Sequence, residues 1–201
     1  MNAMNNIAVY CGSNLGEISD YYYGAKLMGK AIAERGSRLV YGGGSAGLMG
    51  TLADSVLEHG GKATGVIPYF LAEKEIAHDG LDELIMTNTM PERKSKMIEL
   101  ADAYVAMAGG LGTYEELFEV LSNAQLELDL SPIGFLNING FFDPILTLLK
   151  HTAENGFMPL DNLKLVCVSD DPYDLLDKMS QYQFTKAVKW NTPEWFKALQ
   201  N

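Results

Sequence analysis

The segment SRLVYGGGSAGLMG, residues 37–50, decides the fold. A short β-rich apolar stretch at 37–41 passes through a glycine-rich loop into a helical pattern that continues over 48–59. A strand that turns through glycines directly into a helix is half of a βαβ unit, which builds parallel sheets. The segment therefore predicts an α/β domain.

The same alternation extends along the chain in both directions. Short apolar stretches predict further strands at 7–11, 63–68, 84–87, 103–108, 133–138 and 163–169. Helical patterns lie between them at 20–35, 91–100, 113–127, 142–155 and 172–182, and residues 69–80 form a loop with room for a short helix. Because the strands are continuously apolar, helices are expected on both faces of the sheet. The prediction is one doubly wound, mostly parallel, Rossmann-like domain over 1–182, with a tail over 183–201 that carries Trp190 and Trp195 and packs on the domain or a partner.

The composition excludes several classes of protein. The 201 residues carry 26 acidic and 15 basic side chains, a net charge of -11, which disfavours nucleic acid and anionic membrane surfaces. No apolar segment approaches the ~18 residues of a membrane span, and the chain opens without the features of a signal peptide. Cys11 and Cys167 lie in apolar strands and are expected as buried free thiols, which suits a reducing cytoplasm.

Four unusual segments follow predicted strands and should share one rim of the sheet, where α/β proteins bind ligands. They are Cys11–Asn14, Gly42–Gly50, Met90–Lys94 and Gly109–Glu116. Gly42, Gly44 and Gly47 satisfy a GxGxxG pattern, but the acidic residue that a dinucleotide site needs about 20 positions later is missing. An oxidoreductase is therefore disfavoured, and the chain has no Walker-type phosphate loop.

The segment GGLGT, residues 109–113, opens a helix and offers backbone N–H groups and the Thr113 hydroxyl to a phosphate. Glu115 and Glu116 are then expected in the first turn, where Glu115 can simply complement the helix dipole. Glu116 beside a phosphate is harder to explain without a function. Arg93 and Lys94, expected in another first turn, either meet an anion or form a solvated basic turn offset by Glu92.

Other chemistry has little support. His59, His78 and His151 lack the spacing of metal ligands, and no Gly-x-Ser-x-Gly elbow of a serine hydrolase is present. The Met and Tyr positions of 21–28 follow one helical face and are interpreted as core or interface rather than ligand contacts.

At these motifs the sequence resembles the LONELY GUY (LOG) family, often labelled "lysine decarboxylase-like". The family signature Pro-Gly-Gly-x-Gly-Thr-x-x-Glu is matched by residues 108–116, and its Arg-Lys element by Arg93-Lys94. The resemblance also covers CGS at 11–13, YGGGSAGLMG at 41–50, GVIP at 65–68 and EIAH at 75–78. It extends over about residues 7–180, nearly the whole chain.

The resemblance implies a phosphoribohydrolase, which cleaves the N-glycosidic bond of a cytokinin riboside 5'-monophosphate or of AMP. Free base and ribose 5-phosphate are the products, and neither a metal nor a cofactor is implied. Arg93 and Glu116 would be catalytic, with Glu116 facing the positive charge that develops at C1'. The expected substrate contacts are Ser13, Gly43, Gly44, Glu75, Lys94, Gly109, Gly110, Leu111, Gly112, Thr113, Glu115 and Ser122.

The family resemblance also implies a homodimer, with the helix around 117–126 as the candidate contact. The chain departs from the family at Ala108, where Pro is usual, at Ser122-Asn123, where many members have Thr-Trp, and at 129–132, which lacks a usual His and Lys. These departures bear on base preference more than on the reaction. The alternative is a non-catalytic nucleotide-binding or sensing protein on the same fold, for which Glu116 would be unnecessary.

Overall fold

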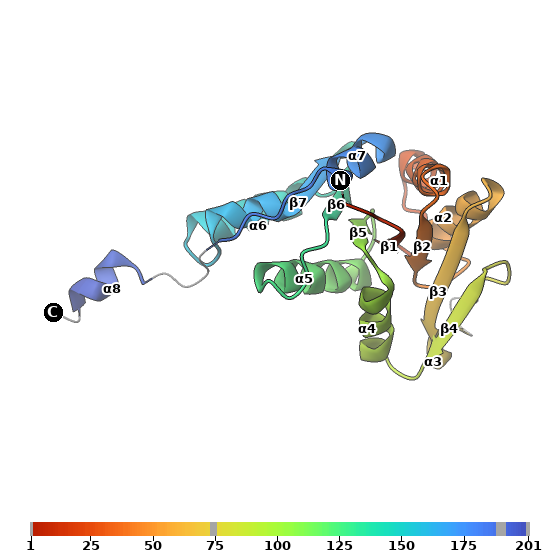
Figure 1. Ribbon diagram of the computed structural model, residues 1–201, viewed down its shortest axis with the longest axis horizontal. Coiled ribbons are helices and arrows are strands. Elements are labelled where there is room, and N and C mark those ends of the chain that lie inside the picture. The colour runs from red at the N-terminus through yellow and green to blue at the C-terminus, as the bar shows by residue number, and fades with distance from the viewer. Residues whose placement is uncertain (1, 73–75, 188–191, 200–201) are drawn as a thin grey trace.

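The computed structural model describes residues 2–72, 76–187 and 192–199. Its centre is a parallel sheet of seven strands in the order β4-β3-β2-β1-β5-β6-β7 (Figure 1). The strands are β1 (Asn6–Tyr10), β2 (Arg38–Tyr41), β3 (Lys62–Pro68), β4 (Glu83–Thr87), β5 (Ala103–Ala106), β6 (Ile133–Leu136) and β7 (Val166–Ser169). The predicted single-domain, Rossmann-like α/β fold is confirmed.

Helices cover both faces of this sheet. They are α1 (Ser19–Glu34), α2 (Gly47–Glu58), α3 (Tyr69–Ala72), α4 (Met90–Leu100), α5 (Leu111–Gln125), α6 (Asp143–Glu154), α7 (Pro172–Ser180) and α8 (Glu194–Leu199), with 3-10 helices η1 (Ile138–Gly140) and η2 (Leu160–Leu165). Side chains alternate along β1, so Ile7 and Val9 join the core under α1, α2 and α7, whereas Ala8 and Tyr10 join the core under α4, α5 and α6.

The strand order reverses at β1. From β1 the chain runs outward through β2, β3 and β4, and then returns to place β5 on the other side of β1, with Val9 beside Val105. The chain therefore leaves β1 toward α1 on one face of the sheet and leaves β5 toward α5 on the other face, which opens a crevice at the carboxyl ends of these two strands. This crevice positions the site described below.

Several element boundaries differ from the sequence prediction. Helix α5 begins at Leu111, two residues before the predicted Thr113, and β7 begins at Val166 because the preceding six residues form η2. The residue before α1 is Ile18, which offers no side-chain cap, so the predicted capping by Ser19 or Asp20 is wrong. Cys11 is buried and its thiol pKa is raised by burial, whereas Cys167 is only half-buried.

The start of the tail contacts the domain. Phe184 packs against the core beneath α4–α6, and Lys186 pairs with Glu127 just after α5, with 2.8 Å between Nζ and Oε2. Every described side chain of α8, including Trp195, is exposed, and Trp190 lies outside the described residues. The packing of the whole tail on the domain or a partner stays a prediction. None of the described helices is long and apolar enough to cross a membrane.

Tyr41, at the end of β2, generates a stability prediction. Its ring is fully buried, and its hydroxyl meets no hydrogen-bond partner among the described residues, while burial raises its pKa and keeps it protonated. Tyr41→Phe removes this desolvated hydroxyl at nearly constant volume. We expect the free energy of unfolding, measured by urea titration, to stay constant or rise by up to ~1 kcal/mol.

Tyr104→Phe is the matched control. The Tyr104 hydroxyl donates to Oδ2 of Asp129 at 2.5 Å, so its removal leaves a partner behind and should lower the free energy of unfolding by ~1–2 kcal/mol. An equal loss in both variants would show that the Tyr41 hydroxyl has a partner of its own.

Candidate functional site

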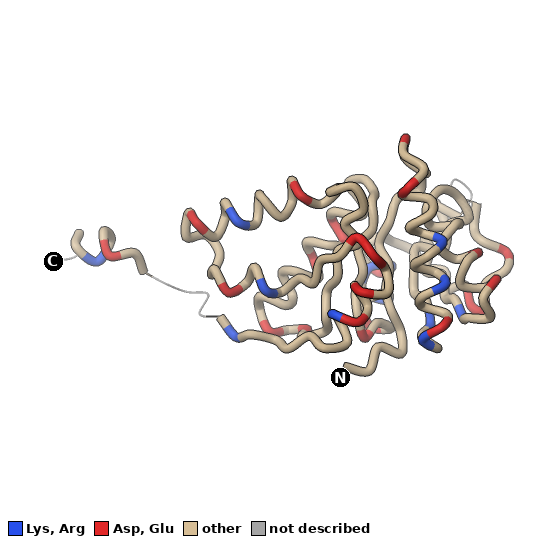
Figure 2. The backbone as a smooth tube through the Cα atoms, turned by 90° about the horizontal axis from the view of Figure 1, so that it is seen from above, with Lys and Arg blue, Asp and Glu red and all other residues tan. Residues whose placement is uncertain are grey.

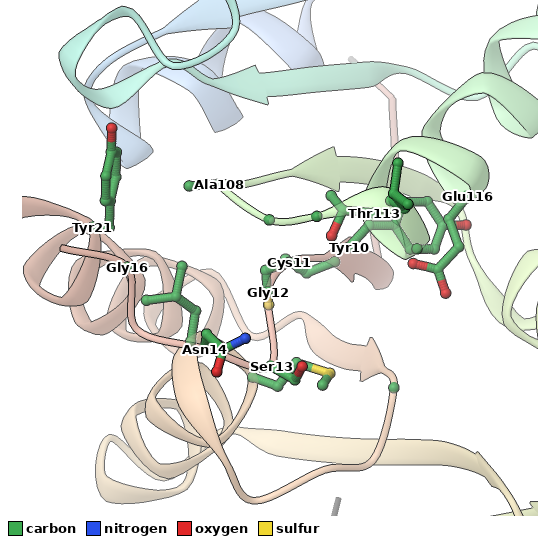
Figure 3. Close-up of a pocket in the computed structure, with 18 of the residues that line it drawn as sticks. Tyr10, Cys11, Gly12, Ser13, Asn14, Gly16, Tyr21, Ala108, Thr113 and Glu116 are labelled. Atoms are coloured by element: carbon green, nitrogen blue, oxygen red, sulfur yellow. The ribbon is translucent and has the colours of Figure 1, made fainter. Parts of the chain in front are cut away.

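A cavity of about 470 Å³ opens at the carboxyl ends of β1 and β5 (Figure 3). Its walls are the loop over 11–16 after β1, the loop over 108–110 after β5 and the first turn of α5. Gly12 donates its N–H to the Ala108 carbonyl at 2.9 Å, which ties the two loops together. Ala108, where the family signature has Pro, therefore joins one wall of the cavity to the other.

The N-terminus of α5 points its backbone into this cavity. Gly110 is the N-cap, and the first helical bond runs from the Tyr114 N–H to the Gly110 carbonyl at 3.1 Å. The N–H groups of residues 111–113 consequently have no acceptor within the helix, and all three residues line the cavity. Such a helix start is a site for an anion such as a phosphate.

The presence of glycine in this loop has one physical reason at position 109 and another at positions 110 and 112. A Cβ on Gly109 would lie 2.1 Å from Oγ1 of Thr113 and 2.9 Å from the Gly12 nitrogen, so packing alone requires glycine there. A Cβ on Gly110 or Gly112 would meet nothing within 4 Å, and neither residue has a positive φ. The chain itself therefore does not demand glycine at these two positions, whereas a ligand that approaches the backbone would.

Arg93 enters the cavity wall from α4. Its side chain is buried, with Nε donating to the Val66 carbonyl and Nη2 to the Gly42 carbonyl, both at 3.0 Å. The guanidinium has five N–H donors, so these two bonds leave donors for a ligand. A Cβ on Gly42 would lie 2.1 Å from Nη2, which explains the first glycine of the 42–47 loop. The alternative of a solvated basic turn is wrong for Arg93.

Lys94 lies outside the cavity lining. Its Nζ binds Glu115 at 2.8 Å and Glu119 at 3.1 Å, and the hydrogen bond that Lys94 donates to Glu115 raises the Lys94 pKa. This pair of contacts joins α4 to α5. Because Thr89 caps α4, Arg93 and Lys94 follow the first turn rather than forming part of it.

Glu116 is half-buried and lines the cavity beside Tyr10 (Figure 3). Burial raises the pKa of Tyr10, and the negative charge of Glu116 raises it further. Since α5 starts at Leu111, its first turn holds no acidic residue, and the expectation that Glu115 and Glu116 lie there is wrong. The helix dipole therefore accounts for neither glutamate.

The structure brings most of the predicted site residues together. Ser13, Arg93, Glu116 and all of 109–113 line one cavity. Glu115 and Lys94 bind each other beside it, and Ser122 lies in a separate groove between α5 and α6. Glu75 lies outside the described residues.

Gly43 and Gly44 do not line the cavity, and both contact the segment over residues 77–78. The Gly43 carbonyl accepts the His78 N–H at 3.0 Å, and Gly44 forms an isolated bridge with Ala77. Gly43 also adopts a φ of 78°, which favours glycine. These contacts pin the 76–78 segment over the glycine-rich loop, and the prediction that both glycines contact substrate stays a prediction.

The cavity also contains residues that the sequence interpretation missed. Among these residues are Tyr21 and Phe141, which pack edge-to-face with ring centroids 5.6 Å apart. Asn14 and Met90, which belong to two of the predicted rim segments, also line the cavity. The interpretation of Tyr21 as core or interface rather than ligand contact is therefore incomplete. Its place near the start of the helix that follows the Cys11–Asn14 loop was the available signal. Among the described residues, no cluster of three or more His, Cys, Asp or Glu side chains could hold a metal ion.

Solved structures share this architecture. A molybdenum cofactor carrier protein from Chlamydomonas reinhardtii aligns with a TM-score of 0.67 at 23% identity, covering 90% of this chain and 98% of that chain. A molybdenum cofactor binding protein from Rippkaea orientalis aligns with the same TM-score at 20% identity and the same coverage. At these identities the likeness shows the fold alone.

Sequence relatives are closer. The chain is 40% identical over 176 residues to rice "Probable cytokinin riboside 5'-monophosphate phosphoribohydrolase LOGL1", covering 88% of this chain and 79% of the relative. It is 44% identical over 167 residues to the "Cytokinin riboside 5'-monophosphate phosphoribohydrolase" of Rhodococcoides fascians, covering 83% and 84%. The Arabidopsis thaliana relative LOG2 is 36% identical over 196 residues, covering 94% and 92%. A family described as "Possible lysine decarboxylase" matches residues 49–179, and with these relatives it shows that the chain belongs to the LOG family.

Proposed function

We propose that this protein hydrolyses the N-glycosidic bond of cytokinin riboside 5'-monophosphates, of AMP, or of both, and releases free base and ribose 5-phosphate. One observation carries the proposal. The N–H groups at the start of α5 that have no acceptor within the helix, the Arg93 guanidinium and the Glu116 carboxylate meet in a single cavity. The relatives named as phosphoribohydrolases support the same activity for this chain.

The three groups divide the reaction between them. The backbone of residues 109–113 holds the 5'-phosphate at the start of α5. Glu116 stabilises the positive charge that develops at C1' as the bond to the base breaks, and activates the water that attacks there. Arg93 donates an N–H to the leaving base or to the ribose, and the water proton passes to the base. Two free thiols fit a cytoplasmic location for this reaction.

A purely binding protein would need the phosphate site without Glu116. The charge of Glu116 is unfavourable for a bound phosphate, and the dipole of α5 does not require it, because the residue lies beyond the first turn. This placement favours the enzyme over the non-catalytic alternative.

Glu116→Gln should abolish base release while largely retaining nucleotide binding. Removing the charge that faces the transition state should lower kcat by ~10²–10³-fold, measured by chromatography of free adenine or isopentenyladenine. Glu99→Gln is the control, because Glu99 pairs with Lys96 on α4 and does not line the cavity, and it should stay within about threefold of the wild-type kcat. Near wild-type turnover in Glu116→Gln would remove Glu116 from the mechanism.

Nucleosides should be far poorer substrates than their 5'-monophosphates. The phosphate does not react, so its contacts with the start of α5 serve to hold C1' against Glu116, and their loss should cost ~10²-fold or more in kcat/KM. Adenosine is compared with AMP, and isopentenyladenosine with its monophosphate. Equal kcat/KM within a pair would mean that the loop is only a structural turn.

Gly112→Ala separates a ligand role of the loop from a structural one. The added methyl meets no atom of the chain, and alanine is the better helix former, so the free energy of unfolding should not fall and can rise by ~0.5–1 kcal/mol. The KM for AMP should nevertheless rise, because the methyl blocks close approach of the phosphate. An unchanged KM would argue against backbone binding at this position.

The protein is also proposed to form a two-fold dimer. In the predicted contact helix, Leu117, Val120 and Leu121 are buried against the chain's own sheet, so most of its apolar side chains are not available to a partner. Three exposed apolar side chains, Phe118 on α5, Leu148 on α6 and Phe157 just after α6, border a groove of about 280 Å³. These side chains replace the buried face as the proposed contact.

Light scattering at micromolar concentration should report twice the chain mass. Phe118→Asp should shift the protein to the monomer, because a carboxylate would be desolvated in the interface. Leu160→Asp is the control for an exposed apolar residue that does not line the groove, and it should leave the dimer intact. A monomeric wild-type protein would contradict the proposed dimer.

A further inference from the structure

Tyr10 shares the cavity with Glu116 but has no role in the chemistry described so far. It is the last residue of β1, its side chain is only 3% exposed, and it lines the cavity. In Figure 3 its ring lies next to the Glu116 side chain. A phenol therefore lies beside the proposed catalytic carboxylate.

The ring of Tyr10 is held in place by a neighbouring aromatic ring. It stacks on the ring of Tyr104, with centroids 6.2 Å apart and planes within 9° of parallel. The Tyr104 hydroxyl in turn donates to Oδ2 of Asp129 at 2.5 Å. Since Tyr104 belongs to the neighbouring strand β5, the sheet itself sets the orientation of the Tyr10 ring.

The Tyr10 hydroxyl remains protonated at any working pH. Burial raises its pKa well above the ordinary value, and the charges of Glu116, Glu119 and Asp129, together with Tyr104, raise it further. A protonated phenol beside a carboxylate is a hydrogen-bond donor. A hydroxyl at this depth is also costly unless it donates, and phenylalanine would fill the core equally well if packing were its only role.

We propose that Tyr10 is a positioning residue, whose O–H donor orients the Glu116 carboxylate in the cavity and keeps it ionised. The proposal rests on the proposed function, because Glu116 is the group that Tyr10 serves. Arg93, Lys94, Glu115 and Glu119 are the other charged groups around this end of α5, and Lys94 binds both Glu115 and Glu119. The proposal gives Tyr10 no contact with the phosphate.

Tyr10→Phe tests this role with kinetics. The kcat should fall by about 10-fold, the loss expected for one hydrogen bond to a charged group, while the KM for AMP changes by less than about threefold. The acidic limb of the kcat/KM profile should move to higher pH, because a carboxylate without its donor is protonated more readily. A wild-type kcat with an unmoved limb would overturn the proposal.

Tyr104→Phe is the matched control. It removes a hydroxyl from the same ring stack, but that hydroxyl serves Asp129 rather than the cavity. It should lower stability and leave the acidic limb in place. An equal shift of the limb in both variants would assign the effect to the stack and overturn a role for the Tyr10 hydroxyl.

A second measurement separates this proposal from the proposed function. The Glu116 side-chain carboxyl is titrated by carbon NMR in protein labelled at glutamate, with its signal identified by its loss in Glu116→Gln. Tyr10→Phe should raise the titration midpoint of that signal, and Tyr104→Phe should not. A raised midpoint in a protein that releases no base would support the positioning role and overturn the hydrolase, whereas an unmoved midpoint would overturn the positioning role whatever the activity.

Discussion

The buried guanidinium of Arg93 is the interaction on which the site depends. It holds the carbonyl of Val66 in β3 and the carbonyl of Gly42 after β2, both at 3.0 Å, and so fixes α4 against two neighbouring strands. A buried cation is tolerated only where such acceptors satisfy it. The glycine at 42 follows from this contact, since any Cβ there would strike Nη2. Arg93 reaches the two carbonyls with two different nitrogens of its planar guanidinium, whereas a lysine would have to reach both with one nitrogen.

The proposed phosphate site has to operate in a protein with a net charge of -11. Figure 2 shows Lys and Arg positions scattered among many Asp and Glu positions. We therefore propose that the attraction for a phosphate is local and comes from the N–H groups at the start of α5 together with Arg93. Lys94 would contribute little to it, since Glu115 and Glu119 compensate its charge. In this proposal the short-range donors, rather than long-range attraction, hold the ligand.

Sequence patterns predicted the sheet and the rim well, because strand and helix periods and glycine loops are local properties. They placed the start of α5 two residues late, since Leu111 gives no local signal that helix begins there, and this misplaced both glutamates. They could not separate Arg93 from its neighbour Lys94, because only the crossing of α4 with β3 decides which cation is buried. Tyr21 was missed for a related reason, as its partner Phe141 lies 120 positions away and joins it only in the folded chain.

Packing and function can be separated residue by residue at this rim. Gly42 and Gly109 are required by the chain, because Arg93 and Thr113 occupy the space that a side chain would need. Gly112 faces open space, and packing gives no reason for it. Glu116 resembles Gly112 in this respect, because the dipole of α5 does not require a carboxylate beyond the first turn of the helix. Both residues line the cavity, and the ligand site that we propose at the start of α5 gives a reason for each of them.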